Sequence, residues 1–156
     1  MTLREIPNIK QYPGEPRRRW FAAETMDLFV WFSESGDIVA FQLAYDKPHA
    51  ERAISWKSGK GFSHTRVDDG ANPGRHPGTP LLVEDGSFDT SRVLAAFQSQ
   101  ASGIDQDIVR FISLRLKDYT PPPGPPARDD EGPYGSVRNA LLNLIRTVSK
   151  CLRNRG

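Results

Sequence analysis

Between residues 17 and 68, apolar and polar side chains alternate, and turn residues interrupt the alternation at short intervals. Alternation with a period of two is typical of strands with one buried face, and closely spaced turns favour antiparallel neighbours. The pattern predicts five strands, at residues 17–24, 26–34, 37–46, 50–57 and 61–68. A short sixth strand is predicted at 79–84, where Pro80 confines it to an edge or to the start of the strand.

The turn residues also predict how the strands pair. A tight two-residue turn is expected at Ser35 and Gly36, and further turns at 47–48 and 58–60. The first turn fixes a register in which Phe32 lies opposite Val39, and the register assigns each side chain to one face. Carried across the sheet, it predicts one continuously apolar face, made of Phe21, Leu28, Val30, Phe32, Val39, Phe41, Leu43, Ile54 and Trp56.

Two segments between residues 89 and 117 carry apolar residues at helical spacing. Asp89 is the predicted N-cap of the first helix and Asp105 that of the second, because a carboxylate can accept the unpaired amide protons of a first turn. Gly103 suits the position just after the first helix. The sequence therefore predicts an α+β domain over residues 1–118, an antiparallel β-meander of five to six strands with two helices packed on one face.

The composition changes after this domain. Residues 119–135 contain the run PPPGPP, which predicts a stiff, Pro-rich linker without internal hydrogen bonds. Residues 136–156 are predicted to form a basic C-terminal helix, the tail, with a seam of apolar positions at Val137, Leu141, Leu144, Val148 and Cys151. Three roles stay open for residues 136–155: docking on the domain's own sheet, pairing with another helix, and lying on an anionic membrane surface.

Charge is divided unevenly between the domain and the tail. The net charge is +2, but five of the 21 basic residues lie after Pro133, where there is no acidic residue. The remaining 16 basic residues face all 19 acidic ones, so residues 1–132 carry a net charge of −3. Because phosphate neutralisation supplies most nucleic-acid affinity, a nucleic-acid partner is not expected for this domain.

Cysteine content and the N-terminal residues indicate the cellular compartment. Cys151 is the single cysteine, so an internal disulfide framework and a zinc site built on several thiolates are excluded. The first 16 residues contain no apolar block of the kind that follows the charges of a secretory signal. A cytoplasmic protein is therefore expected.

The second face of the predicted sheet mixes aromatic and polar groups. An apolar patch with a polar rim can mark an interaction site, and we interpret this face as the binding surface of a non-enzymatic, protein-interaction module. The other interpretation is that the tail or a second copy of the domain covers it. The expected partner is thus another protein or a second copy. Ser55 belongs to this face, and the candidate binding residues on it are Trp20, Phe29, Trp31, Gln42, Phe62, His64 and Arg66.

Catalytic chemistry is less well supported by the sequence. No nucleophile elbow or phosphate-binding loop is present, so we assign no catalytic residue and expect no cofactor. His64, Asp68, Asp69 and His76 have the chemistry of metal ligands, although their spacing matches no known motif and the glycines and prolines around them are ordinary turn residues. A small metal-dependent hydrolase that uses His64, Asp68 and His76 is the alternative.

Several strings of the chain, IPNIKQYPGEPRRRWFAAETMDLFVWF, FQLAYDK, ERAISW, VDDG and TPLLVEDGSFD, resemble a family of small uncharacterised bacterial proteins. The resemblance covers residues 6–119 and leaves out most of the linker and the tail. It implies a bacterial, intracellular, single-domain protein. It implies no catalytic residue, because that family has no established activity.

Overall fold

The computed structural model of the protein describes residues 1–47, 50–68 and 81–121. The tail and nearly all of the predicted linker lie outside the described residues. In the described part, seven strands form one antiparallel sheet, and each strand pairs with the next one along the chain. The strands are β1 (Arg4–Glu5), β2 (Arg17–Ala22), β3 (Met26–Phe32), β4 (Ile38–Tyr45), β5 (Arg52–Lys57), β6 (Gly61–Asp68) and β7 (Leu81–Glu84).

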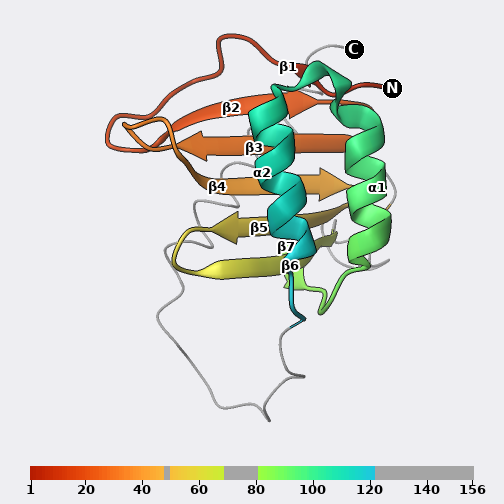
Figure 1. Ribbon diagram of the computed structural model, residues 1–156. Coiled ribbons are helices and arrows are strands. Elements are labelled where there is room, and N and C mark those ends of the chain that lie inside the picture. The colour runs from red at the N-terminus through yellow and green to blue at the C-terminus, as the bar shows by residue number, and fades with distance from the viewer. Residues whose placement is uncertain (48–49, 69–80, 122–156) are drawn as a thin grey trace, which may run out of the picture.

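Two helices follow the sheet, α1 (Thr90–Gln100) and α2 (Gln106–Lys117), joined by the short 3-10 helix η1 (Ala101–Gly103). Both helices cross the same face of the sheet (Figure 1). The predicted α+β class, with an antiparallel meander and two helices on one face, is confirmed for the described residues. None of the described helices has the length and hydropathy needed to cross a membrane.

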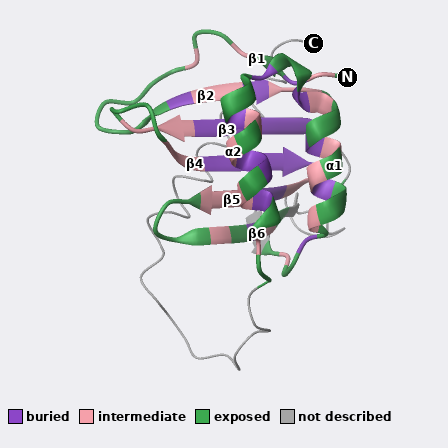
Figure 2. Ribbon diagram, in the orientation of Figure 1, coloured by how far each residue is buried: buried purple, intermediate pink, exposed green. Residues whose placement is uncertain are grey.

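The core lies between the helices and the sheet face that they cover. The strands contribute Phe21, Leu28, Val30, Phe41, Leu43 and Ile54, which are almost fully buried, as the predicted apolar face requires. The helices contribute Val93, Phe97, Ile108, Ile112 and Leu116 to the same cluster. Burial is concentrated in the central strands β3 and β4 (Figure 2). We call this side of the sheet the helix face and the opposite side the outward face.

The hairpin between β3 and β4 differs in detail from the prediction. Val30 lies opposite Phe41 as expected, but the register shifts after Trp31, so Phe32 lies opposite Ile38 and not opposite Val39. The backbone N–H of Ser33 donates to the carbonyl of Asp37 at 2.8 Å. Three residues therefore lie between Ser33 and Asp37, and the last of them, Gly36, has a φ of +90°. This is a common hairpin loop, in which glycine at the left-handed position accommodates a bulge.

The two predicted helix caps behave differently. The carboxylate of Asp89 accepts a hydrogen bond from the backbone N–H of Arg92 at 3.0 Å, which confirms the first cap. Asp105 occupies the predicted position but makes no side-chain capping bond. Its carboxylate instead accepts a hydrogen bond from Arg19 at 2.6 Å, while the same guanidinium binds Glu5 at 2.7 Å. The charge of Arg19 has drawn the Asp105 side chain away from the helix amides.

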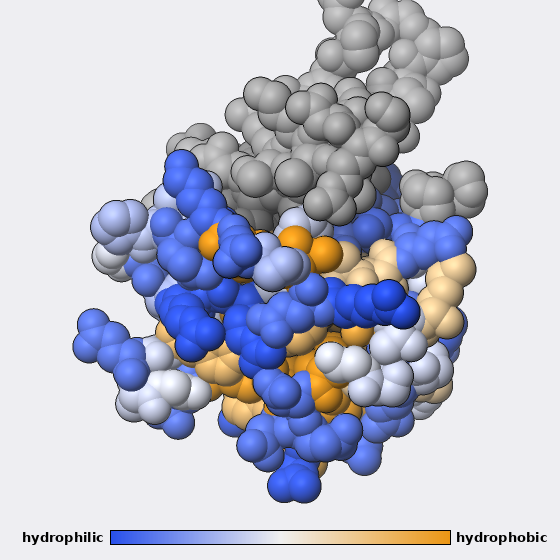
Figure 3. Space-filling model, turned by 90° about the horizontal axis from the view of Figure 1, so that it is seen from above, coloured by the Kyte–Doolittle hydropathy of each residue, from blue (hydrophilic) through white to orange (hydrophobic). Residues whose placement is uncertain are grey.

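The N-terminus is attached to the connection between the helices. The backbone N–H of Leu3 donates to the carbonyl of Gln100 at 2.8 Å. A Cβ atom at Gly103 would lie 2.5 Å from the carbonyl oxygen of Leu3, so this close approach requires glycine. From above, most visible side chains are hydrophilic, with hydrophobic atoms in a band between them (Figure 3). This end of the core therefore has a polar rim.

Candidate binding site

Four of the predicted binding residues lie together on the outward face. Trp20 on β2 lies opposite Phe29 on β3, and Phe29 lies opposite Gln42 on β4. Trp31 is two residues along β3 from Phe29 and therefore points to the same side. Ser55 on β5 continues the row beyond Gln42. These positions follow from the alternation of the strands, which is the signal that predicted them.

The aromatic members of this group contact one another. The rings of Trp20 and Phe29 are stacked, with centroids 5.4 Å apart and 12° between their planes. The rings of Phe29 and Trp31 lie 6.1 Å apart at 32°. Both distances fall in the range in which aromatic pairs attract beyond simple burial. Phe29 is buried and the two tryptophans are half-buried, so the ladder Trp20–Phe29–Trp31 has a closed centre and accessible ends.

The other three predicted residues belong to the helix face, so their placement beside the aromatic ladder was wrong. Phe62 lies opposite Trp56, and His64 lies opposite Ile54. Arg66 lies opposite Arg52 in the same ladder. The turn at 58–60 has the predicted length and puts Lys57 opposite Gly61, so Phe62 lies beside Trp56, which was assigned to the helix face. The error was therefore in carrying the alternation across this turn, because a slip of one position moves every side chain to the other face.

The side chains at the centre of the outward face are more deeply buried than contacts with their neighbours in the sheet explain. Gln42 is 3% exposed, and neighbouring Ala44 and Ala53 are 7% and 2% exposed. Both alanines belong to this face, because they pair with each other and alternate with core residues. The Oε1 atom of Gln42 is buried without a hydrogen-bond partner among the described residues. A buried acceptor of this kind costs about 1–3 kcal/mol unless a donor reaches it.

Charged groups frame the outward face, and the sequence analysis missed them. Asp27 is buried and forms an ion pair with Lys47, and its carboxylate is also 3.4 Å from the indole nitrogen of Trp20. Arg18 is buried as well, with its guanidinium 4.8 Å from the ring of Tyr12 and hydrogen-bonded to the carbonyl of Lys10 at 2.9 Å. The alternation alone assigns Asp27 and Arg18 to this face, so the signal was present in the sequence.

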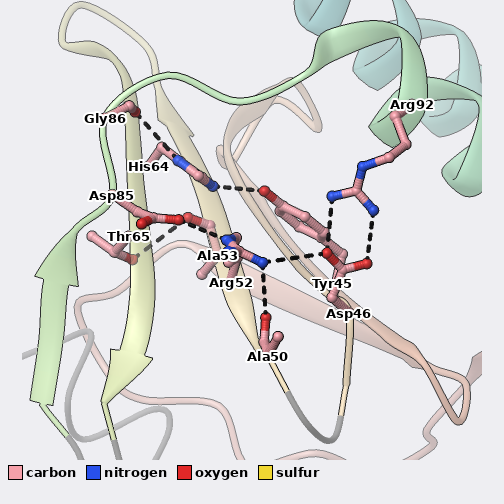
Figure 4. A network of polar contacts seen from close by, with 10 residues as sticks. All are labelled: Tyr45, Asp46, Ala50, Arg52, Ala53, His64, Thr65, Asp85, Gly86 and Arg92. Atoms are coloured by element: carbon pink, nitrogen blue, oxygen red, sulfur yellow. Dashed lines mark hydrogen bonds and ion pairs between the residues drawn. The ribbon is translucent and has the colours of Figure 1, made fainter.

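A second polar cluster lies at one end of the helix face (Figure 4). The hydroxyl of Tyr45 is 2.6 Å from Nε2 of His64, and Nδ1 of His64 is 3.3 Å from the carbonyl of Gly86. Because a carbonyl only accepts, Nδ1 must carry the proton and Nε2 accepts from the tyrosine. Burial lowers the pKa of His64 and raises that of Tyr45 to about 12, so both groups are neutral at pH 7.

Ion pairs surround this neutral pair (Figure 4). The Nε of Arg52 donates to Asp85 at 2.6 Å, and the guanidinium of Arg92 binds both carboxylate oxygens of Asp46, at 3.0 and 2.9 Å. The hydrogen bonds from Arg92 hold the pKa of Asp46 below its usual value. Asp46 has a φ of +58°, a conformation that aspartate tolerates better than most residues. These charges neutralise one another, which is typical of a structural network that fixes the ends of β4, β5 and β6.

The predicted metal site gains no support from the described part of the molecule. Both ring nitrogens of His64 already have partners, so neither is free to bind a metal. The side chain of Asp68 and all of Asp69 and His76 lie outside the described residues. Within the described ranges, no three histidine, cysteine or acidic side chains are grouped so that they could hold a metal ion. The metal-dependent hydrolase stays a prediction.

Comparison of the chain with protein-family models, with curated proteins and with solved structures gave no match. The resemblance to a bacterial family therefore stays a prediction, and function is inferred from the geometry of the two clusters.

Proposed function

We propose that this protein is a protein-binding module and that its outward face binds an apolar segment of a partner protein. The observation that carries the proposal is the aromatic ladder Trp20–Phe29–Trp31 beside the buried Oε1 of Gln42, which has no hydrogen-bond partner among the described residues. Aromatic side chains are the preferred anchors of protein interfaces. The unpaired oxygen adds a specific requirement, because it needs one hydrogen-bond donor from whatever covers it.

The contrast between the outward face and the Tyr45–His64 cluster on the helix face favours binding over catalysis. Its titratable groups have partners already, and the histidine and tyrosine are held in their neutral forms. A general base needs a free lone pair within reach of a substrate proton, and here the lone pair of His64 faces the tyrosine hydroxyl. The cluster stabilises the sheet, while the outward face offers accessible aromatic edges.

The proposal can be tested with a peptide library displayed on phage and selected against the full chain. We expect peptides with aromatic or aliphatic anchors to be enriched, and their affinity to fall at least about tenfold when Trp31 is replaced by serine, since buried aromatic anchors dominate interface energies. The matched control is Trp56→Ser. Trp56 is also half-buried, but it packs on the helix face against Phe111, with ring centroids 5.4 Å apart.

The two tryptophan variants separate binding from folding. Trp56→Ser should lower the melting temperature more than Trp31→Ser while leaving peptide affinity unchanged at temperatures where the variant is folded. If no peptide is enriched, or if the selected peptides bind Trp31→Ser as tightly as the unmodified protein, the outward face is not a binding surface and the proposal is wrong.

A further inference from the structure

We infer that, without a partner, the outward face is covered by the chain's own tail, residues 136–156, so that the protein inhibits its own binding site. The inference rests on the proposed function, because the tail and the partner would share one surface. The tail, as an amphipathic basic helix, is then the ligand that occupies this surface. A partner must displace that helix in order to bind.

The side chains at the centre of the outward face are buried, although no described helix covers them. One face of an antiparallel sheet can remain in water, and small side chains on such a face are then accessible. Here Gln42, Ala44 and Ala53 are more than nine-tenths buried, although α1 and α2 both cross the other face (Figure 1). Alanine has too short a side chain to bury itself against its strand neighbours. A second layer over β4 and β5 accounts for these values.

The tail fits this surface in its apolar pattern and in its length. Its apolar positions repeat at intervals of four and three residues, which gives a single seam along a helix. A helix of 20 residues is about 30 Å long, and five strands spaced about 4.8 Å apart span roughly 20 Å. The tail can therefore cross the aromatic ladder and the alanine pair together. A helix also brings polar side chains beside its seam that can reach the Oε1 of Gln42.

The path of the chain after α2 brings the tail within reach of the outward face. α2 ends at Lys117, and the ring of Tyr119 then stacks on Phe88 at 4.1 Å and meets Phe62 edge-on at 5.3 Å. The chain therefore leaves the described part of the molecule beside β6. From there, the 16 residues of 120–135 span about 50 Å as an extended polyproline-type segment. Each layer packed on a sheet lies about 10 Å from it, so passing from the helix layer to the other side requires about 20 Å, and a stiff linker is long enough.

Charge and tethering both favour this contact. Residues 1–118 contain 15 basic and 16 acidic residues, a net charge of −1, and the residues after Pro133 carry +5, so the two parts attract one another weakly. The linker also makes docking of the tail intramolecular, so weaker contacts are enough to keep the surface occupied than a separate partner would need. A partner with a similar apolar seam must then compete with the tail, which raises the affinity that it needs.

The contact can be tested in the full chain by cross-linking to Cys151, the single cysteine, which lies on the predicted seam. Ser55→Cys and Ser63→Cys each place a second thiol on the outward face, where these serines lie opposite each other. Ser99→Cys is the matched control, because Ser99 is exposed on α1, across the sheet. A short bismaleimide is added to dilute protein, and the products are separated by mass spectrometry after digestion.

We expect cross-links within one chain to form at least about tenfold faster from Ser55→Cys or Ser63→Cys than from Ser99→Cys, reflecting the local concentration of the docked tail. Equal rates from both faces would show that the tail is not docked and would overturn the inference. Cross-links between two chains would also overturn it, because a second copy would then cover the face.

A second measurement shows whether the docked tail blocks binding. Leu141→Asp with Leu144→Asp places charges on the seam, while Asn139→Asp with Asn143→Asp places the same charges on the opposite side of the helix. The seam variant should bind the selected peptides at least about tenfold more tightly than the control variant. Equal affinities would overturn self-inhibition while leaving the proposed function intact. If no peptide binds either variant, the proposed function fails, and the cross-link shows whether the tail is a permanent cover.

Discussion

The two faces of one sheet are built from the same strands but in different ways. On the helix face, Phe41, Leu43 and Ile54 are at most 1% exposed and pack in one cluster with residues of α1 and α2. On the outward face, Trp20, Phe29 and Trp31 pack mainly against one another along two strands. The alternation of the strands thus separates a completed core from a surface whose layer is incomplete in the described residues.

Buried polar groups show the same difference. On the helix face, His64 is held by Tyr45 on one side and Gly86 on the other, so its hydrogen-bonding capacity is used. On the outward face, the Oε1 of Gln42 is buried with no partner among the described residues. Satisfied polar groups are typical of a finished structure, and an unsatisfied one calls for an explanation. This difference is consistent with the proposed binding role of the outward face.

The largest expected effect separates the two faces by packing. Phe41→Ala should lower the free energy of unfolding by about 3–5 kcal/mol, because it opens a cavity between sheet and helices. Phe29→Ala should cost only about 1.5–3 kcal/mol, the value of burying one such side chain. Urea denaturation of both variants measures the difference. Equal costs would mean that the outward face is as much a core as the helix face.

The next largest effect tests whether the ion pair of Asp27 with Lys47 on the outward face is shielded from water. Asp27→Asn leaves Lys47 without its ion-pair partner, and breaking a buried pair should cost about 3 kcal/mol. Asp118→Asn is the control, since Asp118 is well exposed and 4.0 Å from Arg115, and its loss should change stability by less than about 0.5 kcal/mol. Chemical denaturation at low and high salt compares them. A cost below about 1 kcal/mol for Asp27→Asn would place this pair in water.

A third pair of variants compares the two buried polar groups. Tyr45→Phe removes the donor to Nε2 of His64 and should cost about 1–3 kcal/mol, the penalty for an unsatisfied buried group. Gln42→Met removes an acceptor without a described partner and should be neutral or slightly stabilising. Melting temperatures of the two variants are sufficient. A clear loss of stability in Gln42→Met would contradict this expectation and show that a donor outside the described residues reaches Oε1 of Gln42.

The smallest expected effect is a dependence on pH. Burial lowers the pKa of His64 in the folded protein below its ordinary value of 6.5, so the unfolded chain takes up this proton first. Stability is complete above pH 6.5 and falls as the pH drops towards the folded value. Denaturation between pH 7.5 and pH 5 should show a shallower loss in His64→Gln than in the unmodified protein. Identical slopes would contradict the buried, neutral state of His64.

The meander and the helices were predictable because their signals are local. Strands β2 to β6 and the short edge strand β7 follow from alternation and turn residues, and Asp89 follows from the chemistry of a helix N-terminus. The two-residue strand β1 was not predicted. Its two residues carry no periodicity, and it depends on contacts such as that of Glu5 with Arg19.

The candidate site was only half predictable. Trp20, Phe29, Trp31 and Gln42 share a face because β2, β3 and β4 are joined as expected. The error at β6 was one of assignment, because the predicted turn at 58–60 already puts Lys57 opposite Gly61 and Phe62 opposite Trp56. The wrong face for β6 also hid the pairing of His64 with Tyr45. The contact of Arg19 with Asp105 joins residues 86 positions apart, which no local pattern reports.

The order of the strands has a consequence for how the molecule assembles. Each strand of the described sheet pairs with its neighbour in the chain, so the ladders from β2 to β6 close over short distances and can grow one hairpin at a time. The hydrogen bond from Leu3 to Gln100 instead joins the two ends of the described fold. Because it needs α1 in place, we expect it to form late in folding, so that its loss would mainly speed unfolding.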